Sequence, residues 1–408
     1  MKSVWILNHY AQEPGGPGGT RHYSLARSLM RNGWSASVIA ASTEHGTGRE
    51  RLMPGETMRL DTFNGVPFLW LRTASYSGNG VDRVRNMIGY TWSALKPEHT
   101  RQLERPDAIV GSSVHPFAAW AGLRLARRHG VPFVFEVRDL WPQTLVDLGR
   151  LSERHPMTMA LRVLEQHLYK NAAQIVVLLP HAREYIEPLG IAAEKIVWVP
   201  NGIELEIFPG PQPKETGDTF TFMYFGAHGT ANGLDNVLRA MSLVQGADTE
   251  RLINLRMIGD GPLKPSLIEM ARQLDLKNVS FEDPVPKKQI ASLAAEADAF
   301  VFNLINAPVF KYGISSNKLF DFMACGRPVI FSCDAGNNPV EAAKGGVTVL
   351  AGDPHALARA MIGLSALPPA ERQRMGAANR RHIEENYEFD RLGIKFAGAL
   401  DTALRAGK

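Results

Sequence analysis

One pattern occurs twice in this chain: a short apolar strand runs into a glycine-rich loop, and an amphipathic helix follows. In the first half, Val4–Leu7 leads to PGGPGG and to a helical pattern from Tyr23 to Met30. In the second half, Phe220–Phe225 leads to GAHGTANG and to a helical pattern over Leu234–Leu243. This order of elements is the opening of a doubly wound parallel sheet. The sequence therefore predicts an α/β protein with two Rossmann-like domains.

The Pro- and Gly-rich segment VPNGIELEIFPGPQP, which begins at Val199, is the expected junction between the domains. A chain of 408 residues is long enough for two domains of ordinary size. We predict an N-terminal domain over 1–205, a C-terminal domain over 206–388, and a helical stretch over 389–408 that crosses back to the first domain. Since ligands bind at the carboxyl ends of parallel strands, the two sheets are expected to face a central cleft.

Composition and charge exclude several classes of protein. Cys325 and Cys333 are the two cysteines, which form neither a disulfide framework nor a metal-ligand spacing and indicate a reducing, cytoplasmic location. No run approaches about 18 apolar residues, and the apolar start of the chain is too short for a signal peptide, so we expect no membrane-spanning segment. The net charge of +4 favours an anionic ligand or an anionic membrane face. Without an aromatic-interleaved basic array, we expect no nucleic-acid partner.

The first glycine loop is a candidate phosphate site. Glycines let backbone amides approach an anion, and the N-terminus of the following helix adds partial positive charge. Arg21 lies in the first turn of that helix, within reach of the same anion. The alternative is a flexible turn. The loop does not match GxGxxG, and GxxxxGK[ST] is absent, which disfavours a dehydrogenase and a P-loop kinase. The candidate glycines are Gly15, Gly16, Gly18 and Gly19.

Two loops of the second half carry the same kind of candidate. In GAHGTANG, a histidine and a threonine can donate hydrogen bonds to phosphate oxygens, although a plain strand-to-helix turn remains an alternative. The later loop GDGP follows the strand-like run Leu255–Ile258. The candidate donor-binding residues of the two loops are Gly226, His228, Gly229, Thr230, Gly259, Asp260 and Gly261.

The most specific motif is FKYGISSNKLFDFMACGRPVI, over residues 310–330. We predict a helix that begins near Asn317 and is capped by one of the two preceding serines. Lys318 and Asp321 then lie within one turn of its start. A pyrophosphate at the helix start would meet Lys318 or Lys311, and Asp321 would accept hydrogen bonds from a ribose diol. The alternative is an amphipathic helix with a solvated lysine and aspartate.

Charged side chains also end two strands of the first half. Arg138 and Asp139 follow the run Phe133–Val137, where Arg138 would contact a donor phosphate and Asp139 would orient an acceptor hydroxyl. The alternative is a buried structural Arg–Asp pair. His115 follows the run Ala108–Val110 at an equivalent strand end, and either contacts the acceptor or has a structural role.

Taken together, these motifs resemble the family 4 retaining glycosyltransferases, which have the GT-B fold. LFDFMACGRPVI is similar to the C-terminal signature of that family, and VPNG at 199–202, GDGP at 259–262, VRDLWP at 137–142 and the first glycine loop are further matches. Matches fall along nearly the whole chain. The combination of VRDLWP, GAHG and KYGISSNKLFD resembles the branch that builds bacterial surface polysaccharides, including N-acetyl-fucosamine transferases of O-antigen and capsule assembly.

The resemblance implies an activity and its partners. It implies transfer of an N-acetylated amino or deoxyamino sugar from a UDP-sugar to a glycan acceptor linked to polyprenyl diphosphate, with retention of configuration. No cofactor besides the donor is expected. The absence of an Asp-x-Asp triplet agrees with a reaction that needs no metal. The enzyme would be cytoplasmic or peripheral on the inner membrane face.

The chain departs from the family pattern at several positions. The second glutamate of the family falls on Asp321 and the first on Gly313, which with Ile314 remains in the expected donor site. The usual arginine and lysine after the second glycine loop fall on Ala227 and Asn232, and the usual histidine falls on Arg138. Other cations would have to replace them, and the candidates are Lys311, Lys318, Arg138 and Arg21.

Two other functions stay open at this point. A sugar-nucleotide 2-epimerase has the same two-domain shape but works by elimination, without an acceptor. A catalytically inactive homologue would act as a scaffold for an assembly complex, and the missing carboxylate and cations keep this alternative open.

A basic segment of the first half is a candidate membrane contact. It can rest on an anionic leaflet, or it can form a solvated helix pair over the sheet. Its basic residues are Arg83, Arg85, Lys96, Arg101 and Arg105, interleaved with Val84, Met87, Ile88, Tyr90, Trp92 and Leu95.

Overall fold

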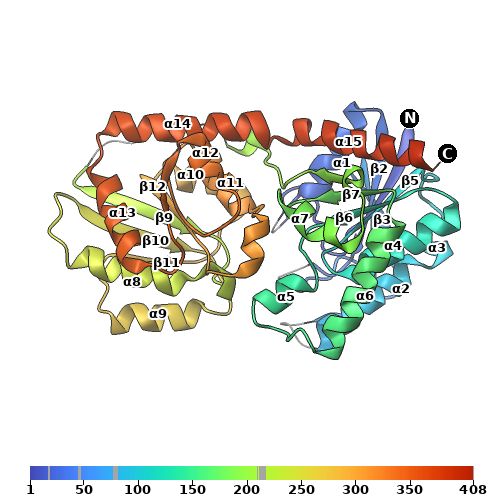
Figure 1. Ribbon diagram of the computed structural model, residues 1–408, viewed down its shortest axis with the longest axis horizontal. Helices are drawn as coiled ribbons and strands as arrows, with labels where there is room; N and C mark the ends of the chain where they lie inside the picture. The colour runs from blue at the N-terminus through green and yellow to red at the C-terminus, as the bar shows by residue number, and fades with distance from the viewer. Residues whose placement is uncertain (17–18, 45–46, 77–80, 209, 211–216, 408) are drawn as a thin grey trace. The chain divides into compact units, whose positions relative to one another are not determined.

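The computed structural model describes residues 1–16, 19–44, 47–76, 81–208, 210 and 217–407 (Figure 1). The chain forms two compact units. The first consists of Met1–Gly202, Tyr312–Ser315 and Phe389–Lys408, and the second of Ile203–Lys311 and Ser316–Glu388. Each unit is built on one twisted sheet with helices packed against it, so the predicted fold of two doubly wound α/β domains is confirmed.

The first unit contains an eight-stranded sheet of order β3-β4-β2-β1-β5-β6-β7-β8. Its neighbours pair in parallel except for the hairpin of β3 and β4. The order reverses direction between β1 and β5, which is where ligands bind in open sheets of this kind. The strands are β1 Lys2–Leu7, β2 Trp34–Ala41, β3 Met58–Phe63, β4 Val66–Leu71, β5 Ala108–Ser112, β6 Phe133–Val137, β7 Gln174–Val177 and β8 Ile196–Trp198.

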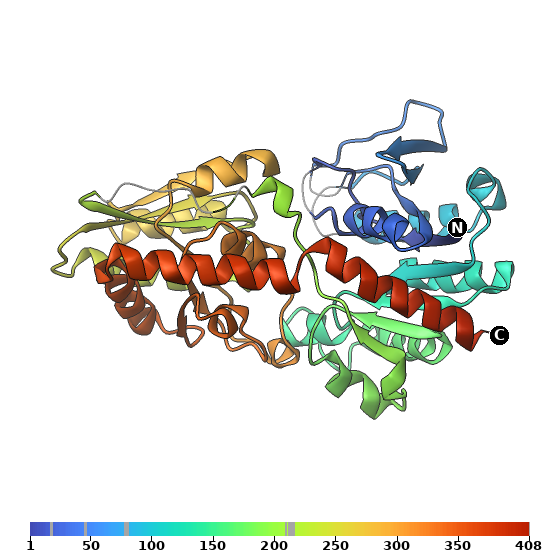
Figure 2. The ribbon, with the colours of Figure 1, turned by 90° about the horizontal axis from the view of Figure 1, so that it is seen from above.

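Both faces of this sheet are covered, because side chains along a strand point alternately to either side. Trp5 and Leu7 of β1 join the core under α2, α4 and α6, whereas Val4 and Ile6 join the core under α1 and α15. Figure 2 shows α15 lying across the first unit beside α1. The helices are α1 Arg21–Arg31, α2 Val81–Ala94, α3 Pro97–Thr100, α4 Pro116–His129, α5 Gln143–Asp147, α6 Pro156–Asn171, α7 Ala182–Ile186 and α15 Phe389–Ala406.

The second unit contains a six-stranded parallel sheet of order β11-β10-β9-β12-β13-β14. Its strands are β9 Thr219–Phe225, β10 Leu252–Ile258, β11 Val279–Glu282, β12 Ala299–Asn303, β13 Val329–Ser332 and β14 Gly346–Val349. Its helices are α8 Leu234–Gln245, α9 Lys264–Gln273, α10 Lys287–Ala294, α11 Asn317–Ala324, α12 Pro339–Ala343, α13 Pro354–Ala366 and α14 Pro369–Asn386. Of the helices in the described ranges, none is both long and apolar enough to cross a membrane.

The units differ in detail from the predicted division of the chain. The first continuous part of the first unit ends at Gly202 rather than at residue 205. The chain returns to this unit at Phe389, where α15 begins. This unit also includes Tyr312–Ser315, which we placed in the second domain. Two hydrogen bonds hold this segment in the first unit: the Asn201 amide donates to Ser315 Oγ at 2.7 Å, and the His181 amide donates to the Tyr312 carbonyl at 3.0 Å.

Close packing of α4 against β5 requires glycine. A Cβ built on Gly111 would lie 2.7 Å from Cα of Ala119 and 2.9 Å from the Phe133 ring, and the adjoining Gly122 approaches Gly111 in the same way. The backbones of helix and strand therefore touch directly, at the end of β5 where the sheet order reverses.

We predict that Gly111→Ala lowers the free energy of unfolding by about 1–3 kcal/mol, because the added methyl group overpacks this contact. Urea denaturation measures the change. Gly89→Ala on α2 is the matched control, since a Cβ there meets nothing within 4 Å. Within a helix this control is expected to raise stability by about 0.5–1 kcal/mol. Equal stability of both variants would contradict the packing argument.

Candidate functional site

A buried carboxylate joins three segments of the first unit. Glu136 lies in β6 and is fully buried. Arg21 Nε donates to one of its oxygens at 2.9 Å, and His22 Nε2 lies 2.7 Å from the other. Arg21 also donates to the Val199 carbonyl at 3.0 Å and to the Pro200 carbonyl. The start of α1, the end of β6 and the VPNG segment are therefore held together by one charge cluster.

Electrostatics keep this carboxylate ionised. Burial alone would raise the pKa of Glu136. Interactions with His22 and Arg21, including the hydrogen bond from His22, outweigh burial and hold that pKa well below its ordinary value. Burial lowers the pKa of His22 itself, so Arg21 carries the positive charge of the cluster at neutral pH. The cluster consequently stabilises the fold at neutral pH.

The surroundings of Arg21 correct its predicted role. We expected its guanidinium to contact a donor phosphate, but each of its three nitrogens donates a hydrogen bond within the protein. The side chain is also buried. Arg21 therefore anchors α1 to the neighbouring strand and segment, and the candidate cations for the donor are to be sought elsewhere.

A pair of buried histidines lies beside this cluster. The ring of His115 caps α4: its Nδ1 accepts from the Ala118 amide at 3.2 Å, and its Nε2 lies 2.7 Å from Nδ1 of His9. Burial lowers the pKa of His115 to about 3, with a smaller effect from Arg83. A neutral ring that accepts at Nδ1 carries its proton at Nε2, so His115 donates to His9.

The contacts of His115 favour the structural alternative for this residue. They also identify His9, which our sequence reasoning missed although it directly follows the first strand. The His9 ring stacks between Tyr10 and Tyr90, with ring centroids 4.4 and 4.6 Å away. The pair therefore occupies the ends of β1 and β5, where the sheet order reverses.

Arg138 and Asp139 lie at the neighbouring end of β6. The Arg138 amide donates to Ser113 Oγ at 3.1 Å, and its side chain is half-buried. Asp139 is exposed, although surrounding protein raises the pKa of its carboxyl and the charge of Arg138 opposes that shift. Both side chains stand at a strand end, as the sequence suggested.

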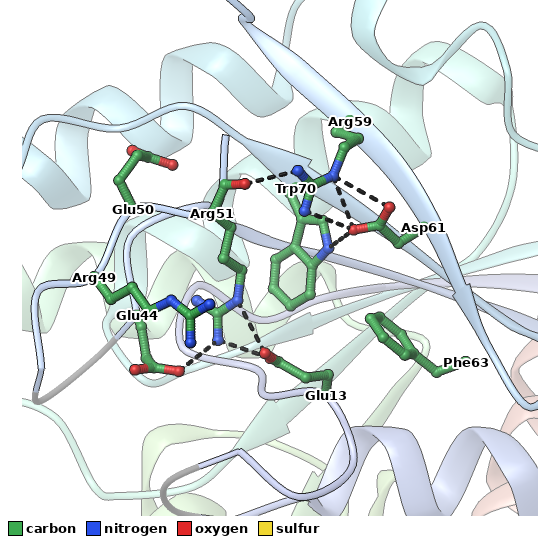
Figure 3. Close-up of a pocket in the computed structure, with 9 residues that line it drawn as sticks. All are labelled: Glu13, Glu44, Arg49, Glu50, Arg51, Arg59, Asp61, Phe63 and Trp70. Atoms are coloured by element: carbon green, nitrogen blue, oxygen red, sulfur yellow. Dashed lines mark hydrogen bonds and ion pairs between the residues drawn. The ribbon is translucent and has the colours of Figure 1, made fainter. Parts of the chain in front are cut away.

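Arg51 contacts the residues that lead into the first glycine loop. The Arg51 guanidinium bonds Gln12, Glu13 and Glu44, and it lies 4.5 Å from the centroid of the Trp70 ring (Figure 3). A hollow of about 160 Å³ lies here, and its charges largely pair with each other. It is lined by Glu13, Glu44, Arg49, Glu50, Arg51, Arg59, Asp61, Phe63 and Trp70.

The glycines of this loop are only partly described. Gly15 has a φ of 82°, and the Gly16 amide donates to the Glu13 carbonyl at 3.1 Å. Gly19 is exposed and precedes Thr20, the N-cap residue of α1. Gly18 lies outside the described residues. A loop anchored by Arg51 thus connects β1 to the N-terminus of α1.

In the second unit, two glycine loops pack backbone against backbone at the ends of β9 and β10. A Cβ on Gly259 would lie 2.0 Å from the Gly226 carbonyl oxygen, and one on Gly261 would lie 2.6 Å from the His228 carbonyl oxygen. The His228 amide donates to the Asp260 carbonyl at 2.8 Å. These loops, predicted separately as candidate phosphate sites, therefore form one surface.

The side chain of His228 belongs to this surface. It is fully buried, and within the described parts of the chain neither ring nitrogen has a hydrogen-bond partner. Its ring stacks on Tyr224 at a centroid distance of 5.9 Å. Unbonded buried nitrogens are costly, so a bound polar group would stabilise this site. Gly229 precedes a short 3₁₀ turn, Thr230–Asn232, in which Thr230 is exposed.

Lys318 reaches into the same surface from α11. Its ammonium donates to the Tyr224 hydroxyl at 3.0 Å and bonds Oδ1 of Asn232, and its stem lies against Gly226. Burial lowers the pKa of Lys318 to about 7. No ion pair joins it to a carboxylate in the described ranges. The charge of Lys318 thus lies beside Asn232, the position where the family pattern has a lysine.

The remaining residues of the motif divide between the units. Asn317 opens α11, and Asp321 is half-buried one turn later. Ser316 takes the N-cap position but makes no side-chain cap bond. Gly313 and Ile314, which we expected in the donor site, belong to the first unit, and their role in donor binding stays a prediction. Lys311 is exposed, and it is the last residue of the second unit before the segment Tyr312–Ser315.

Comparison with known proteins identifies both halves. Residues 16–202 match the glycosyl transferase 4-like domain, and residues 219–366 match the glycosyl transferases group 1 domain. A probable glycosyltransferase of Pseudomonas aeruginosa, WbjE, is 25% identical over 76% of this chain and 78% of its own length. A D-inositol 3-phosphate glycosyltransferase of Kineococcus radiotolerans is 24% identical over 79% and 74%.

Solved structures have the same two-domain fold. Sucrose-phosphate synthase from Thermosynechococcus elongatus superposes with a TM-score of 0.77 at 16% identity, over 100% of both chains. HepE of Anabaena in complex with UDP-glucose superposes with a TM-score of 0.67 at 14% identity, over 98% of this chain and 100% of its own.

We predict that Glu136→Gln lowers the free energy of unfolding at pH 7 by about 3–5 kcal/mol, because it leaves the Arg21 guanidinium buried without its charge partner. The pKa of Glu136 is depressed in the folded state, so its contribution is present above the ordinary value of 4.5 and is lost as the pH falls towards the folded pKa. Denaturation at several pH values should show the deficit shrinking in acid.

Glu165→Gln is the control for this experiment, because its pKa is shifted the other way. Burial raises the pKa of Glu165 to about 7, although hydrogen bonds from Tyr185 and Tyr169 oppose the shift. The native carboxyl therefore costs stability as the pH rises from 4.5 to 7, and the amide should remove that cost. If both variants showed the same pH dependence, the assigned charge states would be wrong.

Proposed function

We propose that this chain, which is a glycosyltransferase of the GT-B type, transfers a sugar from a UDP-sugar to a glycan acceptor with retention of anomeric configuration. The observation that carries the proposal is the surface of the second unit where the Lys318 ammonium bonds Asn232 of the GAHGTANG loop, which packs against the GDGP loop. The two matched domains favour sugar transfer over 2-epimerisation.

The second unit offers complementary groups for a nucleoside diphosphate. Lys318 supplies a positive charge without a carboxylate partner in the described ranges, and His228 supplies buried ring nitrogens without hydrogen bonds. Charge-assisted hydrogen bonds to phosphate are the strong ones. Asp321, one turn into α11, would accept from the ribose hydroxyls. The structure of HepE in complex with UDP-glucose supports uridine as the nucleoside.

In this proposal Lys318 takes the place of the phosphate-binding lysine that the family pattern has at the position of Asn232. The family lysine falls on Asn232, and Asn232 Oδ1 bonds the Lys318 ammonium. The side chain reaches this position because Gly226 leaves room for its stem: a Cβ at Gly226 would lie only 3.0 Å from Lys318 Cδ. In this proposal the cation is supplied from α11 instead of from the loop.

The chemistry needs charge stabilisation more than a protein nucleophile. The acceptor hydroxyl attacks the anomeric carbon as the bond to the diphosphate breaks, on the same face, and the leaving phosphate takes the hydroxyl proton. The negative charge that develops on the diphosphate is met by Lys318 and by those loop amides that, unlike the amides of Gly226, His228 and Gly259, do not already donate within the protein. Because these groups are already in the protein, we propose that the reaction needs no metal and no cofactor besides the donor.

The acceptor side of the proposal rests on the first unit. His9 at the end of β1, and Arg138 and Asp139 at the end of β6, stand at strand ends where acceptors are expected to bind. The sequence similarity to the surface-polysaccharide branch supports an N-acetylated amino or deoxyamino sugar. It also supports an acceptor linked to polyprenyl diphosphate, in O-antigen or capsule assembly.

We predict that the protein slowly hydrolyses a suitable UDP-sugar without an acceptor, because water can replace the acceptor hydroxyl at the anomeric carbon. A panel of UDP-sugars that includes UDP-N-acetylglucosamine would be screened for released UDP. The rate should persist in EDTA, and the freed sugar should keep its configuration when first formed. Intact donor across the panel would favour a scaffold, and conversion to a 2-epimer would favour the epimerase.

A second prediction concerns the charge state of Lys318. Its pKa of about 7 means that its positive charge is present below that pH and is lost above it. A diphosphate binds the charged form, so the affinity for UDP-N-acetylglucosamine should fall about fivefold from pH 7 to pH 8. The diphosphate of this ligand is a diester and keeps its charge in this range. Calorimetry at the two pH values measures the change.

Two variants separate the effect of Lys318 titration on donor affinity from other effects of pH. Lys318→Met should bind the donor weakly and with no pH dependence between these values. Asp321→Ala should weaken binding by about 1.5–3 kcal/mol at both pH values, because its hydrogen bonds to ribose do not involve the titrating group. A native affinity that does not change with pH would remove Lys318 from the diphosphate site.

A further inference from the structure

A buried carboxyl in α6 takes no part in the proposed reaction. Glu165 is 4% exposed. The Tyr169 hydroxyl donates to Glu165 Oε1 at 3.1 Å, and the Tyr185 hydroxyl donates to Glu165 Oε2 at 3.0 Å. Burial raises the pKa of both tyrosines, so both hydroxyls keep their protons. The carboxyl is therefore bonded by two neutral donors, one from its own helix and one from α7.

Tyr185 connects this carboxyl to the VRDLWP motif. Its hydroxyl accepts a hydrogen bond from Arg162 at 3.1 Å, and Arg162 in turn donates to Gln143 Oε1 at 2.9 Å. Gln143 begins α5 and directly follows the motif, which covers residues 137–142. A line of hydrogen bonds thus runs from Glu165 to the residue after VRDLWP.

The ring of Tyr185 packs against a second motif. It meets the Tyr312 ring edge-on, with centroids 5.6 Å apart and ring planes at 70°. Tyr312 opens the segment Tyr312–Ser315, which belongs to the first unit although the chain on both sides of it belongs to the second. The Tyr312 carbonyl accepts from the amide of His181, the N-cap residue of α7. Tyr312 is therefore held at α7 by a ring contact and by a backbone hydrogen bond.

We propose that Glu165 and Tyr185 are positioning residues that attach the Tyr312–Ser315 segment to the first unit, and that protonation of Glu165 loosens this attachment. While the carboxyl is ionised, both tyrosines donate to a carboxylate, and such charge-assisted hydrogen bonds are about twice as strong as neutral ones. A protonated carboxyl donates through one of its oxygens and accepts less well from the tyrosines. Tyr185 is then less fixed, and its ring holds Tyr312 less firmly.

The pH at which the attachment changes follows from the environment of Glu165. Burial raises the pKa of Glu165 to about 7, although the hydrogen bonds from Tyr185 and Tyr169 and the charge of Arg162 oppose the shift. Because these hydrogen bonds lower the pKa, ionisation strengthens them in return. The attachment is therefore strong above pH 7 and weakens as the pH falls below 7, even though burial makes ionisation costly for the unit as a whole.

The other charged residues near α6 are exposed or paired elsewhere. Helix α4 and strand β6 pack against α6 and contribute apolar side chains to the same core. Glu136 of β6 belongs to the buried ion cluster at α1, and His129 at the end of α4 packs against Trp5. Glu153, which precedes α6, pairs with Arg162 at 2.8 Å. The exposed charged residues of α4, α6 and α7 are Arg124, Arg127, Arg128, His167, Lys170, Arg183 and Glu184.

The attachment matters for transfer because the segment leads into α11. Ser316 takes the N-cap position of α11, and Lys318 lies in the first turn. This consequence rests on the proposed function, in which the second unit binds the donor and the first unit binds the acceptor. Donor affinity then depends on the second unit, whereas transfer also depends on the segment that ties the start of α11 to the first unit.

The test is hydrogen exchange of the full chain at pH 6 and pH 8, without donor or acceptor, corrected for the intrinsic exchange rate at each pH. The reporters are the two amides that bond the segment, those of His181 and Asn201. In the native protein their protection should fall about fivefold from pH 8 to pH 6, since a charged hydrogen bond is replaced by a neutral one. The Ser113 amide, which donates to the Glu136 carbonyl at 2.8 Å in the same unit, should keep its protection. Unchanged reporters, or an equal loss at Ser113, would overturn the proposal.

A neutral variant isolates the charge of the carboxyl. Glu165→Gln has the shape of the protonated carboxyl at every pH, so the protection of both reporters should match the native level at pH 6 under both conditions. The ring of His181, which lies 3.3 Å from Glu184, also titrates, and its effect persists in this variant and is thereby subtracted. A variant with the native pH dependence would remove Glu165 from the attachment.

Two tyrosine variants separate positioning from general stability. Tyr185→Phe keeps the ring but removes the hydroxyl, so the reporters should lose their pH dependence. Tyr169→Phe is the matched control: it removes the other hydroxyl at the same carboxyl, but its ring packs on Phe135, with centroids 5.3 Å apart. This control should keep most of the pH dependence. Equal behaviour of the two variants would contradict the role of Tyr185.

Donor binding distinguishes this inference from the proposed function. Calorimetry with UDP-N-acetylglucosamine should give native affinity for Tyr185→Phe, and a lower affinity would contradict the assignment of the attachment to transfer. Reporter protection that depends on pH, in a native protein that binds no UDP-sugar, would contradict the proposed function alone.

Discussion

The ion cluster of Glu136 with Arg21 and His22 is the interaction on which the first unit depends. It joins the start of α1, the end of β6 and the carbonyls of Val199 and Pro200, segments far apart in the chain. A carboxylate buried this deeply is stable only because a guanidinium and an imidazole meet it. The same cluster fixes the strand ends next to His9 and His115. The order of the candidate acceptor site therefore follows from a structural ion pair.

The second unit holds a positive charge at the surface where we propose that the diphosphate of the donor binds. Gly226, Gly259 and Gly261 let two loops approach more closely than any side chain would allow. The space above Gly226 admits the stem of Lys318, and burial near Tyr224 and Phe302 lowers the pKa of its ammonium to about 7. Lys318 is consequently poised to gain from an anionic ligand, because the ligand would restore the charge that burial disfavours.

Much of the fold followed from patterns local in sequence. The strands of both sheets were expected wherever a glycine loop followed an apolar run, as at β1 and β9. The hairpin of β3 and β4 was not expected, because Met58–Phe63 is an edge strand whose residues are mostly half-buried and show no clear alternation. The segment Tyr312–Ser315 was assigned to the wrong unit, since its attachment depends on Asn201 and His181, which are distant along the chain.

The sequence by itself determined the kinds of group available: two glycine loops with helices after them, a histidine and charged residues at strand ends, and a lysine and an aspartate on one helix. It also indicated the glycosyltransferase fold, since periodicity and glycine placement are local properties. Only the tertiary structure decided which partners these groups meet. It paired Arg21 with Glu136, turned His115 to His9, and brought Lys318 to Asn232. Whether a charge is paired depends on residues far away along the chain, and no local pattern contains that information.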